Sequence, residues 1–375
     1  MKYSKGTYGF DKEFLQKHLS TVELQNGDSK LILSPDLQGR IVTSSAEGDK
    51  GYSFGWINYD LIASGEFLPH CNNFGGEDRY WIGPEGGQYS IFFKNGDPYD
   101  LDHWQTPAPI DTESWKVLEH NAEKAVLKKD MELLNNSGYT FKLTADREIK
   151  LLDQAAIKQE LDIELNGSVD AVCFKSTNKM TNNGDFEWNK ETGMLSIWVL
   201  GQLIPSDRNT VILPFEDQTD GEIVNDSYFG KVDDDRLKIL KNAVLFKGDG
   251  QKRGKIGVGP KRTKPVIGSY DPINQTLTIV KFTFDADKED YINSMWEHQK
   301  EPFKGDVINS YNDGPLPDGT IMGPFYELET SSAAANLKPG ETLVHEHATF
   351  HFKGDISELD QIATTLLGVS INDSF

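Results

Sequence analysis

The chain has 375 residues, 37% of them hydrophobic, and a formal net charge of −21. Acidic side chains occur along its whole length, so we expect a soluble protein, and nucleic acid and anionic membrane are poor candidates as partners. The two cysteines, Cys71 and Cys173, are too few for the disulfide framework of a small secreted scaffold, although one bridge between them stays open.

No apolar run approaches the ~20 residues that a membrane-spanning helix needs. The segment from Met1 to Leu19 is charged rather than signal-like. A cytoplasmic location and a periplasmic or secreted one, with the export signal trimmed, are both compatible with these features.

Short apolar stretches with alternating or β-branched character recur along the chain and predict strands. Clusters of Gly, Asn, Asp and Pro, which favour turns, separate them. The predicted strands are Lys30–Ser34, Gly39–Ser44, Tyr89–Lys94, Lys124–Leu127, Tyr139–Thr144, Ala156–Leu165, Ala171–Ser176, Leu195–Leu200, Val211–Phe215, Val244–Lys247, Lys255–Val258, Thr276–Phe284 and Leu343–Phe352.

Helical periodicity is confined to Asp11–His18, Asp287–His298 and Ile356–Leu367. This distribution predicts an all-β fold, a large sandwich of mostly antiparallel strands with a few peripheral helices. No linker or repeat marks a second domain. We therefore expect one domain over residues 1–375, with an N-terminal extension over 1–20 and a C-terminal helix and tail over 356–375.

The stretch Leu68–Phe93 mixes amide, acidic, basic and aromatic side chains between glycine pairs at 75–76 and 86–87. Sugars offer hydroxyls to carboxylates and amides, and C–H faces to flat rings. Glycine lets the backbone turn and approach a ligand closely. The stretch therefore suits a sugar site, with a purely structural loop as the alternative. Its candidate residues are His70, Asn72, Glu77, Arg79, Trp81 and Glu85.

Each candidate has an expected role beside a structural one. His70 or Glu85 would carry a proton, Arg79 would donate hydrogen bonds to ligand oxygens, and Trp81 would be a stacking platform. Glu77 and Arg79 could instead form a surface ion pair, and Glu85 could instead have a capping or turn-closing role.

A second acidic segment is Gly323–Ser332, which reads as a strand. Side chains alternate between the two faces of a strand, so Glu327 and Glu329 should share one face. In a cavity two such carboxyls would form a coupled pair that retains one proton near neutral pH. On a solvated face they would be ordinary surface acids.

Histidines occur at two further places. His345, His347 and His351 should share one strand face, and the first two have a metal-ligand spacing. Because no third ligand is fixed by the local sequence, we expect no metal. His103 stands beside Trp104 and before a proline, and is a candidate rim residue that contacts the ligand.

Three segments resemble the galactose mutarotase (aldose 1-epimerase) superfamily in the right order. LKPGETLVHEHATFHF, Leu337–Phe352, resembles its closing strand, and SKLILSPDLQGRIVTSS, Ser29–Ser45, resembles its opening hairpin with a Gly-Arg pair at Gly39 and Arg40. FKSTNKMTNNGDFEW, Phe174–Trp188, is similar to the segment that carries an asparagine and a Thr-Asn pair, here Asn178, Thr181 and Asn182.

The resemblance implies a β-supersandwich with Glu327 and Glu329 on its concave side, and Arg40 and Asn182 among the ligand-binding residues. The GGEDRYWIGPEGGQ and YNDGPLPDG signatures look like an uncharacterised bacterial branch of it rather than a true epimerase. Mutarotases follow their Thr-Asn segment with a catalytic histidine. This chain has no histidine between His120 and His298, so the familiar chemistry does not follow.

The sequence thus predicts a protein that binds a small-molecule sugar or a glycan without a cofactor; the oligomeric state stays open. If it is an enzyme, we expect isomerase-like acid–base chemistry, with Glu327 or Glu329 as base and His70 or Glu85 as acid. A glycan-binding module without chemistry is the alternative, and a glycan lyase or hydrolase is a further one, since function does not follow from fold.

Overall fold

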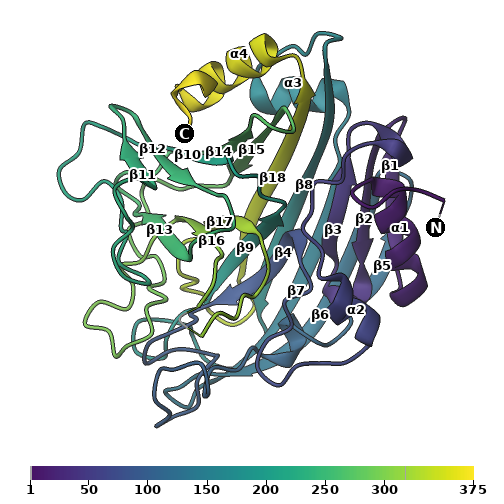
Figure 1. Cartoon of the computed structure of the whole chain (residues 1–375). Coiled ribbons are helices and arrows are strands. Elements are labelled where there is room, and N and C mark those ends of the chain that lie inside the picture. Colours follow the sequence, from purple (N-terminus) through teal and green to yellow (C-terminus); the bar gives the residue numbers. More distant parts are fainter. Residues whose placement is uncertain (1, 317) are drawn as a thin grey trace.

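The computed structural model describes residues 2–316 and 318–375, and it consists of two large sheets (Figure 1). Neighbouring strands in both sheets pair antiparallel. The architecture is therefore the all-β sandwich that the strand pattern predicts.

The first sheet has eight strands in the order β1-β2-β3-β4-β9-β17-β16-β13. In that order they are Val22–Asn26, Ser29–Ser34, Arg40–Ser45, Gly76–Gly83, Ser196–Leu203, Tyr326–Ser331, Ile308–Asn312 and Gly254–Val258. The second sheet has ten strands in the order β11-β12-β10-β14-β15-β18-β8-β7-β6-β5. They are Leu237–Ile239, Ala243–Lys247, Thr210–Pro214, Val266–Asp271, Thr276–Phe282, Thr342–Gly354, Val169–Asn182, Thr140–Leu151, Lys124–Leu134 and Lys116–His120.

Four α-helices lie at the periphery, and short 3-10 turns occupy 35–37, 48–50, 108–110 and 371–373. Helices α1 (Tyr8–His18) and α2 (Tyr59–Ser64) lie beside β1–β3, and α3 (Gln154–Leu161) and α4 (Ile356–Leu367) cover one end of the ten-stranded sheet (Figure 1). The predicted helices at 11–18 and 356–367 are confirmed.

Three predictions of local structure are wrong. Residues 287–298 form an irregular segment with an isolated bridge at Tyr291 instead of a helix, and Tyr89–Lys94 is irregular. The stretch predicted as a strand at 156–165 contains most of helix α3, because the Asp153 side chain accepts a hydrogen bond from the Ala156 N–H and caps the helix. Ile157 and Leu161 then pack one turn apart against the sheet.

The two faces of the eight-stranded sheet differ in character. On β17, Tyr326 and Leu328 pack in the core between the sheets, and Thr330 contacts His345 and His347 of β18. Alternation therefore turns Glu327 and Glu329 to the opposite face, away from the ten-stranded sheet. This is the face on which the site is built.

The space between the sheets also holds buried polar groups. Arg147 forms a fully buried ion pair with Asp78 at 2.5 Å and donates to the Asn178 side chain at 2.6 Å. The Thr330 hydroxyl lies 2.9 Å from a ring nitrogen of both His345 and His347. Burial lowers the pKa of His345 to about 3 and that of His347 to about 4, so both rings are neutral.

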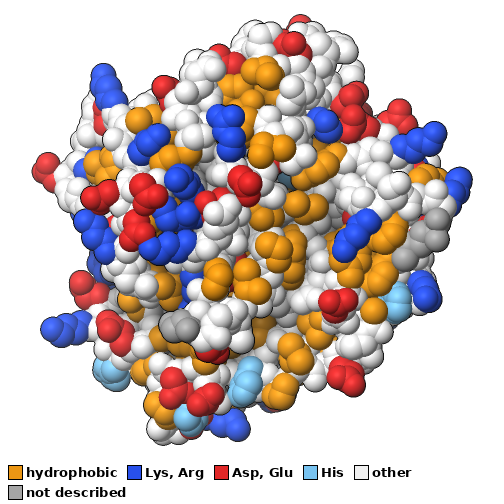
Figure 2. Space-filling view, viewed as in Figure 1, with side chains coloured by type: hydrophobic (Ala, Val, Ile, Leu, Met, Phe, Trp, Pro, Cys, Tyr) orange, Lys and Arg blue, Asp and Glu red, His pale blue; other side chains and the backbone are white. Residues whose placement is uncertain are grey.

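Acidic and basic side chains intermix on the visible surface rather than forming one large patch (Figure 2). Both cysteines are free thiols, with Cys173 buried in the core. Over the described ranges, no helix combines the length and the apolar character that a membrane crossing requires.

Candidate functional site

A cavity with two adjoining compartments lies over the outer face of β4, β9, β17, β16 and β13. The compartments have volumes of about 160 Å³ and about 100 Å³. They share five lining residues, Glu85, Trp198, Phe229, Lys255 and Trp296. Loops that carry Glu85, Phe229 and Trp296 cover the sheet here, so the cavity combines a rigid floor with walls from distant segments.

Strand register brings the floor residues together. Glu327 on β17 pairs with Gln202 of β9 on one side and with Tyr311 of β16 on the other. Tyr311 in turn pairs with Lys255 of β13. Directly paired residues of antiparallel strands have side chains on the same face, so one row of polar groups crosses the sheet beneath the ligand space.

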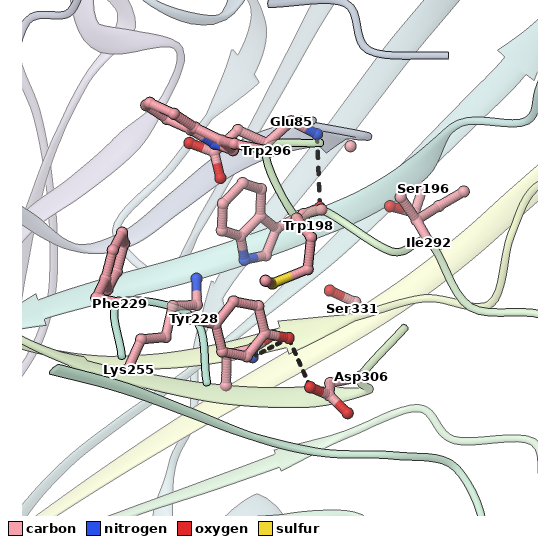
Figure 3. Close-up of a pocket in the computed structure, with 14 residues that line it drawn as sticks. Glu85, Ser196, Trp198, Tyr228, Phe229, Lys255, Ile292, Trp296, Asp306 and Ser331 are labelled. Atoms are coloured by element: carbon pink, nitrogen blue, oxygen red, sulfur yellow. Dashed lines mark hydrogen bonds between the residues drawn. The ribbon is translucent and has the colours of Figure 1, made fainter. Parts of the chain in front are cut away.

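Aromatic rings form most of the wall. The rings of Trp104 and Trp296 stack at 5.7 Å between centroids, and both line the smaller compartment with Trp198. Glu85 and Lys255 lie beside the indole of Trp198, and all three face the same space (Figure 3). Such rings are suited to the C–H faces of a sugar.

Trp81, the predicted stacking platform, borders the smaller compartment but is only 3% exposed. Its indole N–H donates to the Ile110 carbonyl at 3.2 Å. The guanidinium carbon of Arg79 is 3.8 Å from its ring centroid, and Trp198 packs edge-on at 5.3 Å. Trp81 therefore supports Arg79 and Trp198.

Three glutamate carboxyl groups lie at the cavity, in addition to Asp306 in its larger compartment. Glu85 and Glu327 line it directly, and Glu329 lies beneath it with no exposed side-chain surface. Burial raises the pKa of Glu85 to about 7, although Lys255 opposes the rise. Burial, and then the neighbouring Glu329, raises the pKa of Glu327 well above its usual range, against the effect of Arg79. Two proton-carrying groups on different segments thus face one space.

Lys255 balances the buried acid at the floor. Its ammonium donates to Glu329 Oε2 at 2.9 Å, and the Trp198 indole N–H donates to the same oxygen at 2.9 Å. Burial alone would lower the pKa of Lys255, but Glu329, Glu85 and Glu327 outweigh it and raise the pKa. The lysine therefore stays charged next to the ligand space.

The larger compartment ends in a second polar group. The Tyr228 hydroxyl contacts Asp306 at 2.5 Å and accepts a hydrogen bond from the Asn309 amide at 3.1 Å (Figure 3). Ser196 and Ser331 add hydroxyls to this wall. The cavity thus offers hydrogen-bonding groups at both ends and rings between them.

Several buried polar atoms around the smaller compartment have no protein partner within the described part of the chain. They are Arg79 Nε, Trp104 Nε1 and Gln202 Oε1. Buried polar groups in proteins are nearly always hydrogen-bonded. Two spare donors and one spare acceptor therefore fit a cavity that receives a polar ligand.

Glu77 lies in the interior instead of the cavity. Its Oε2 accepts from the Ser44 hydroxyl at 2.8 Å and contacts His351 Nε2 at 2.9 Å. Register between β4 and β9 shifts by one residue between Gly76 and Arg79. This bulge places both Glu77 and Asp78 between the sheets, so the alternative of a surface ion pair of Glu77 with Arg79 is wrong.

Three predicted ligand-binding side chains are engaged in structural contacts. Arg40 is buried and donates to the Gly75 carbonyl at 2.9 Å. Asn72 donates to Asp111 at 2.7 Å. Asn182 donates to the carbonyls of Phe186 and Leu337, each at 2.9 Å.

The two predicted histidines lie on exposed loops. The Nδ1–H of His70 donates to the Trp104 carbonyl at 2.8 Å. This hydrogen bond helps to fix the loop that carries the Trp104 indole. His103 pairs with Asp100 at 2.6 Å, and this contact raises the pKa of His103. Neither is among the side chains that line the cavity.

The glycines of the 68–93 stretch serve chain packing. A Cβ on Gly75, whose φ is +94°, would lie 2.0 Å from the Trp56 carbonyl oxygen, and one on Gly86 would lie 2.3 Å from that of Met295. The Gln88 side chain donates to the Gln299 carbonyl and accepts from the Gln299 N–H, both at 3.1 Å. The loop of Glu85 is therefore pinned to the segment that carries Trp296.

The sequence interpretation missed Lys255, Arg253, Trp198, Trp296 and Phe229. Lys255 and Arg253 belong to KGDGQKRGK, 247–255, which resembles a basic surface loop. The pairing of β13 with β16 places Lys255 opposite Tyr311, and both cations line the compartment that Glu327 also lines. Trp198 lies in a predicted strand, and a tryptophan at such a position could have been proposed as an aromatic wall of a sugar site.

Within residues 2–316 and 318–375, no three histidine, cysteine or carboxylate side chains gather closely enough to hold a metal ion. The three histidines of β18 are instead engaged by Thr330 and Glu77.

Comparison with solved structures gives the same fold at low identity. An Escherichia coli K12 protein assigned provisionally as an aldose 1-epimerase is 11% identical, with a TM-score of 0.52 over 90% of this chain and 99% of that one. A galactose mutarotase-like protein from Lactobacillus casei ATCC 334 is 9% identical, with a TM-score of 0.52 over 89% and 100%. The Slr1438 protein from Synechocystis sp. PCC 6803 is 12% identical, with a TM-score of 0.50 over 90% and 96%.

A search of curated proteins finds no match. A family model, described as "Family of unknown function (DUF6786)", matches residues 6–374. The chain is therefore a member of this family, and it has the galactose mutarotase-like β-sandwich fold.

Proposed function

We propose that this protein binds a sugar in the cavity over β4, β9 and β17 and catalyses acid–base chemistry at the sugar ring. The observation that carries the proposal is the placement of Glu85 and Glu327. They come from a covering loop and from the sheet floor, and both line one cavity with indole walls. A ring and two proton carriers are what anomer interconversion requires.

The two carboxyls have distinct roles in this scheme. Mutarotation needs a base for the proton of the anomeric hydroxyl and an acid for the ring oxygen. Near neutral pH Glu85 is partly ionised, with a pKa of about 7, whereas burial and Glu329 favour the protonated form of Glu327. We therefore assign Glu85 as base and Glu327 as acid, the reverse of the sequence-based expectation; the roles exchange when the ring closes again.

The test follows anomeric exchange of freshly dissolved pure α-aldoses by NMR. We expect acceleration above buffer for at least one sugar, and a loss of about 10²- to 10⁴-fold in Glu327→Gln, the usual contribution of a general acid. The exposed Glu123→Gln is the matched control and should keep the wild-type rate. Acceleration that survives Glu327→Gln would contradict the assignment.

A second candidate function is sugar binding without chemistry. It is favoured by the cavity's composition, since no histidine is among its lining residues in the described ranges. It predicts saturable affinity for a sugar with no exchange above buffer, and an affinity that Glu327→Gln leaves nearly unchanged.

A further inference from the structure

Within residues 2–316 and 318–375, Arg79 is a buried cation without a protein hydrogen-bond or ion-pair partner. Arg79 is only 4% exposed and lines the smaller compartment. Its buried Nε has no hydrogen-bond partner among the described residues. Among the described residues, its guanidinium forms no hydrogen bond or ion pair; it only rests on the Trp81 ring at 3.8 Å. An unpaired buried charge is costly, so a missing anionic partner is the physical expectation.

Other buried arginines of this chain show the contrast. Arg147 is paired with Asp78, and Arg236 is paired with Asp249. Arg262 donates to the carbonyls of Glu216 and Gly221 at 2.8 and 2.9 Å. Arg79 lacks such a carboxylate or carbonyl partner among the described residues, and it borders a cavity.

Arg253 adds a second guanidinium to the same compartment. Its Nε donates to the Tyr311 hydroxyl at 3.2 Å, and its plane lies 3.9 Å from the Phe229 ring centroid. These contacts fix the side chain while its two terminal nitrogens stay free among the described residues. Stacked guanidinium groups with free forks suit bidentate recognition of carboxylate or phosphate.

The acids of the cavity do not use up this positive charge. Glu329 is held by Lys255, and Glu327 accepts from the Gln202 amide at 2.9 Å. Glu85 lines the same compartment. Across the described side chains, none of these three glutamates forms an ion pair with Arg79 or Arg253. The compartment therefore keeps two cations available for a ligand. The net charge of the whole chain is −21, which repels polyanions at long range.

We propose that the ligand is a sugar with a single oxyanionic group, a carboxylate or a phosphate, which Arg79 and Arg253 bind together. This inference rests on the proposed sugar-binding function and narrows its substrate class. The aromatic walls take the ring, and the two guanidinium groups take the charged substituent. The net charge of the protein favours small monoanionic or short ligands over long polyanionic chains.

Calorimetric titration with matched sugars tests the inference. The panel pairs glucose, galactose and mannose with their uronates and with their 6-phosphates, so that the two anion sources are separated. We expect at least one anionic member to bind at least ~10-fold tighter than its neutral counterpart, a difference that corresponds to a single good charged contact. Its affinity should fall as salt rises.

The variants Arg79→Met and Arg253→Met should remove this preference while the affinity for the neutral sugar changes less than about 3-fold. Exposed Arg208→Met is the matched control and should retain the preference. Thermal denaturation shows whether each variant is folded. One folded variant of the two is enough to test whether the preference for the anionic sugar is lost. A neutral sugar that binds as tightly as its anionic counterparts overturns this inference alone. Failure of every sugar to bind overturns the proposed function and this inference with it.

Discussion

Replacement of Glu85 by glutamine should change how stability depends on pH. The pKa of Glu85 rises from an ordinary 4.5 to about 7 in the folded protein because the carboxyl is buried. Between pH 4.5 and about pH 7, Glu85 therefore keeps its proton in the folded state but loses it in the unfolded state. Stability must fall as pH rises through this window, since the folded state binds more protons there.

The size of the effect follows from the same pKa. A rise from 4.5 to about 7 corresponds to roughly 3 kcal/mol at full burial. Glu85 is only partly buried, and solvent screening reduces the effect to about 1–2 kcal/mol. Wild type should therefore lose about 1–2 kcal/mol more than Glu85→Gln between pH 5 and pH 8.

Urea denaturation at both pH values, at one ionic strength, measures this difference. Glu327 titrates in the same protein, so the comparison between wild type and variant, rather than the wild-type profile alone, isolates Glu85. Glu123→Gln, at an exposed position, should follow the wild-type profile. Parallel profiles for wild type and Glu85→Gln would refute the reasoning, because the carboxyl would then be solvated in the folded state.

Three further predictions concern the ring wall, the loop and the interior. Trp198→Ala should weaken sugar binding about 2- to 10-fold, in line with ~0.5–1.5 kcal/mol for an aromatic contact. Trp198→Phe should keep most of the affinity by calorimetry, and equal losses in the two variants would count against stacking. Gly86→Ala should cost about 1–3 kcal/mol in urea and reduce binding, because its Cβ would meet the Met295 carbonyl; unchanged binding would show that the loop position is not critical. Arg147→Met should cost about 3–5 kcal/mol, since it leaves Asp78 buried without its partner; a loss below ~1 kcal/mol would contradict that account.

Alternation along a strand made part of the site predictable. On β17 the face shared by Glu327 and Glu329 follows from period two alone, and the structure shows it. The β-sandwich follows from apolar stretches between turn residues. Such local patterns survive because each strand must bury one face against the other sheet.

Features that depend on register or on distant segments could not be predicted in this way. A one-residue bulge between Gly76 and Arg79 turns Glu77 inward, and no local signal marks it. Lys255 begins a predicted strand, but only the pairing of β13 with β16 shows that it lies opposite Tyr311 and near the acids of β17. The strand-like residues 156–161 form a helix because Asp153 caps them.

The pinned loop of Glu85 has a consequence for how a ligand enters. Gly86 touches the backbone at Met295, and Gln88 and Gln299 exchange hydrogen bonds in both directions. The proton carrier on one loop and the indole of Trp296 on the other are thus mechanically joined. Opening of the cavity would displace both loops together, so the proposed acid–base chemistry requires that the aromatic wall is closed around the sugar.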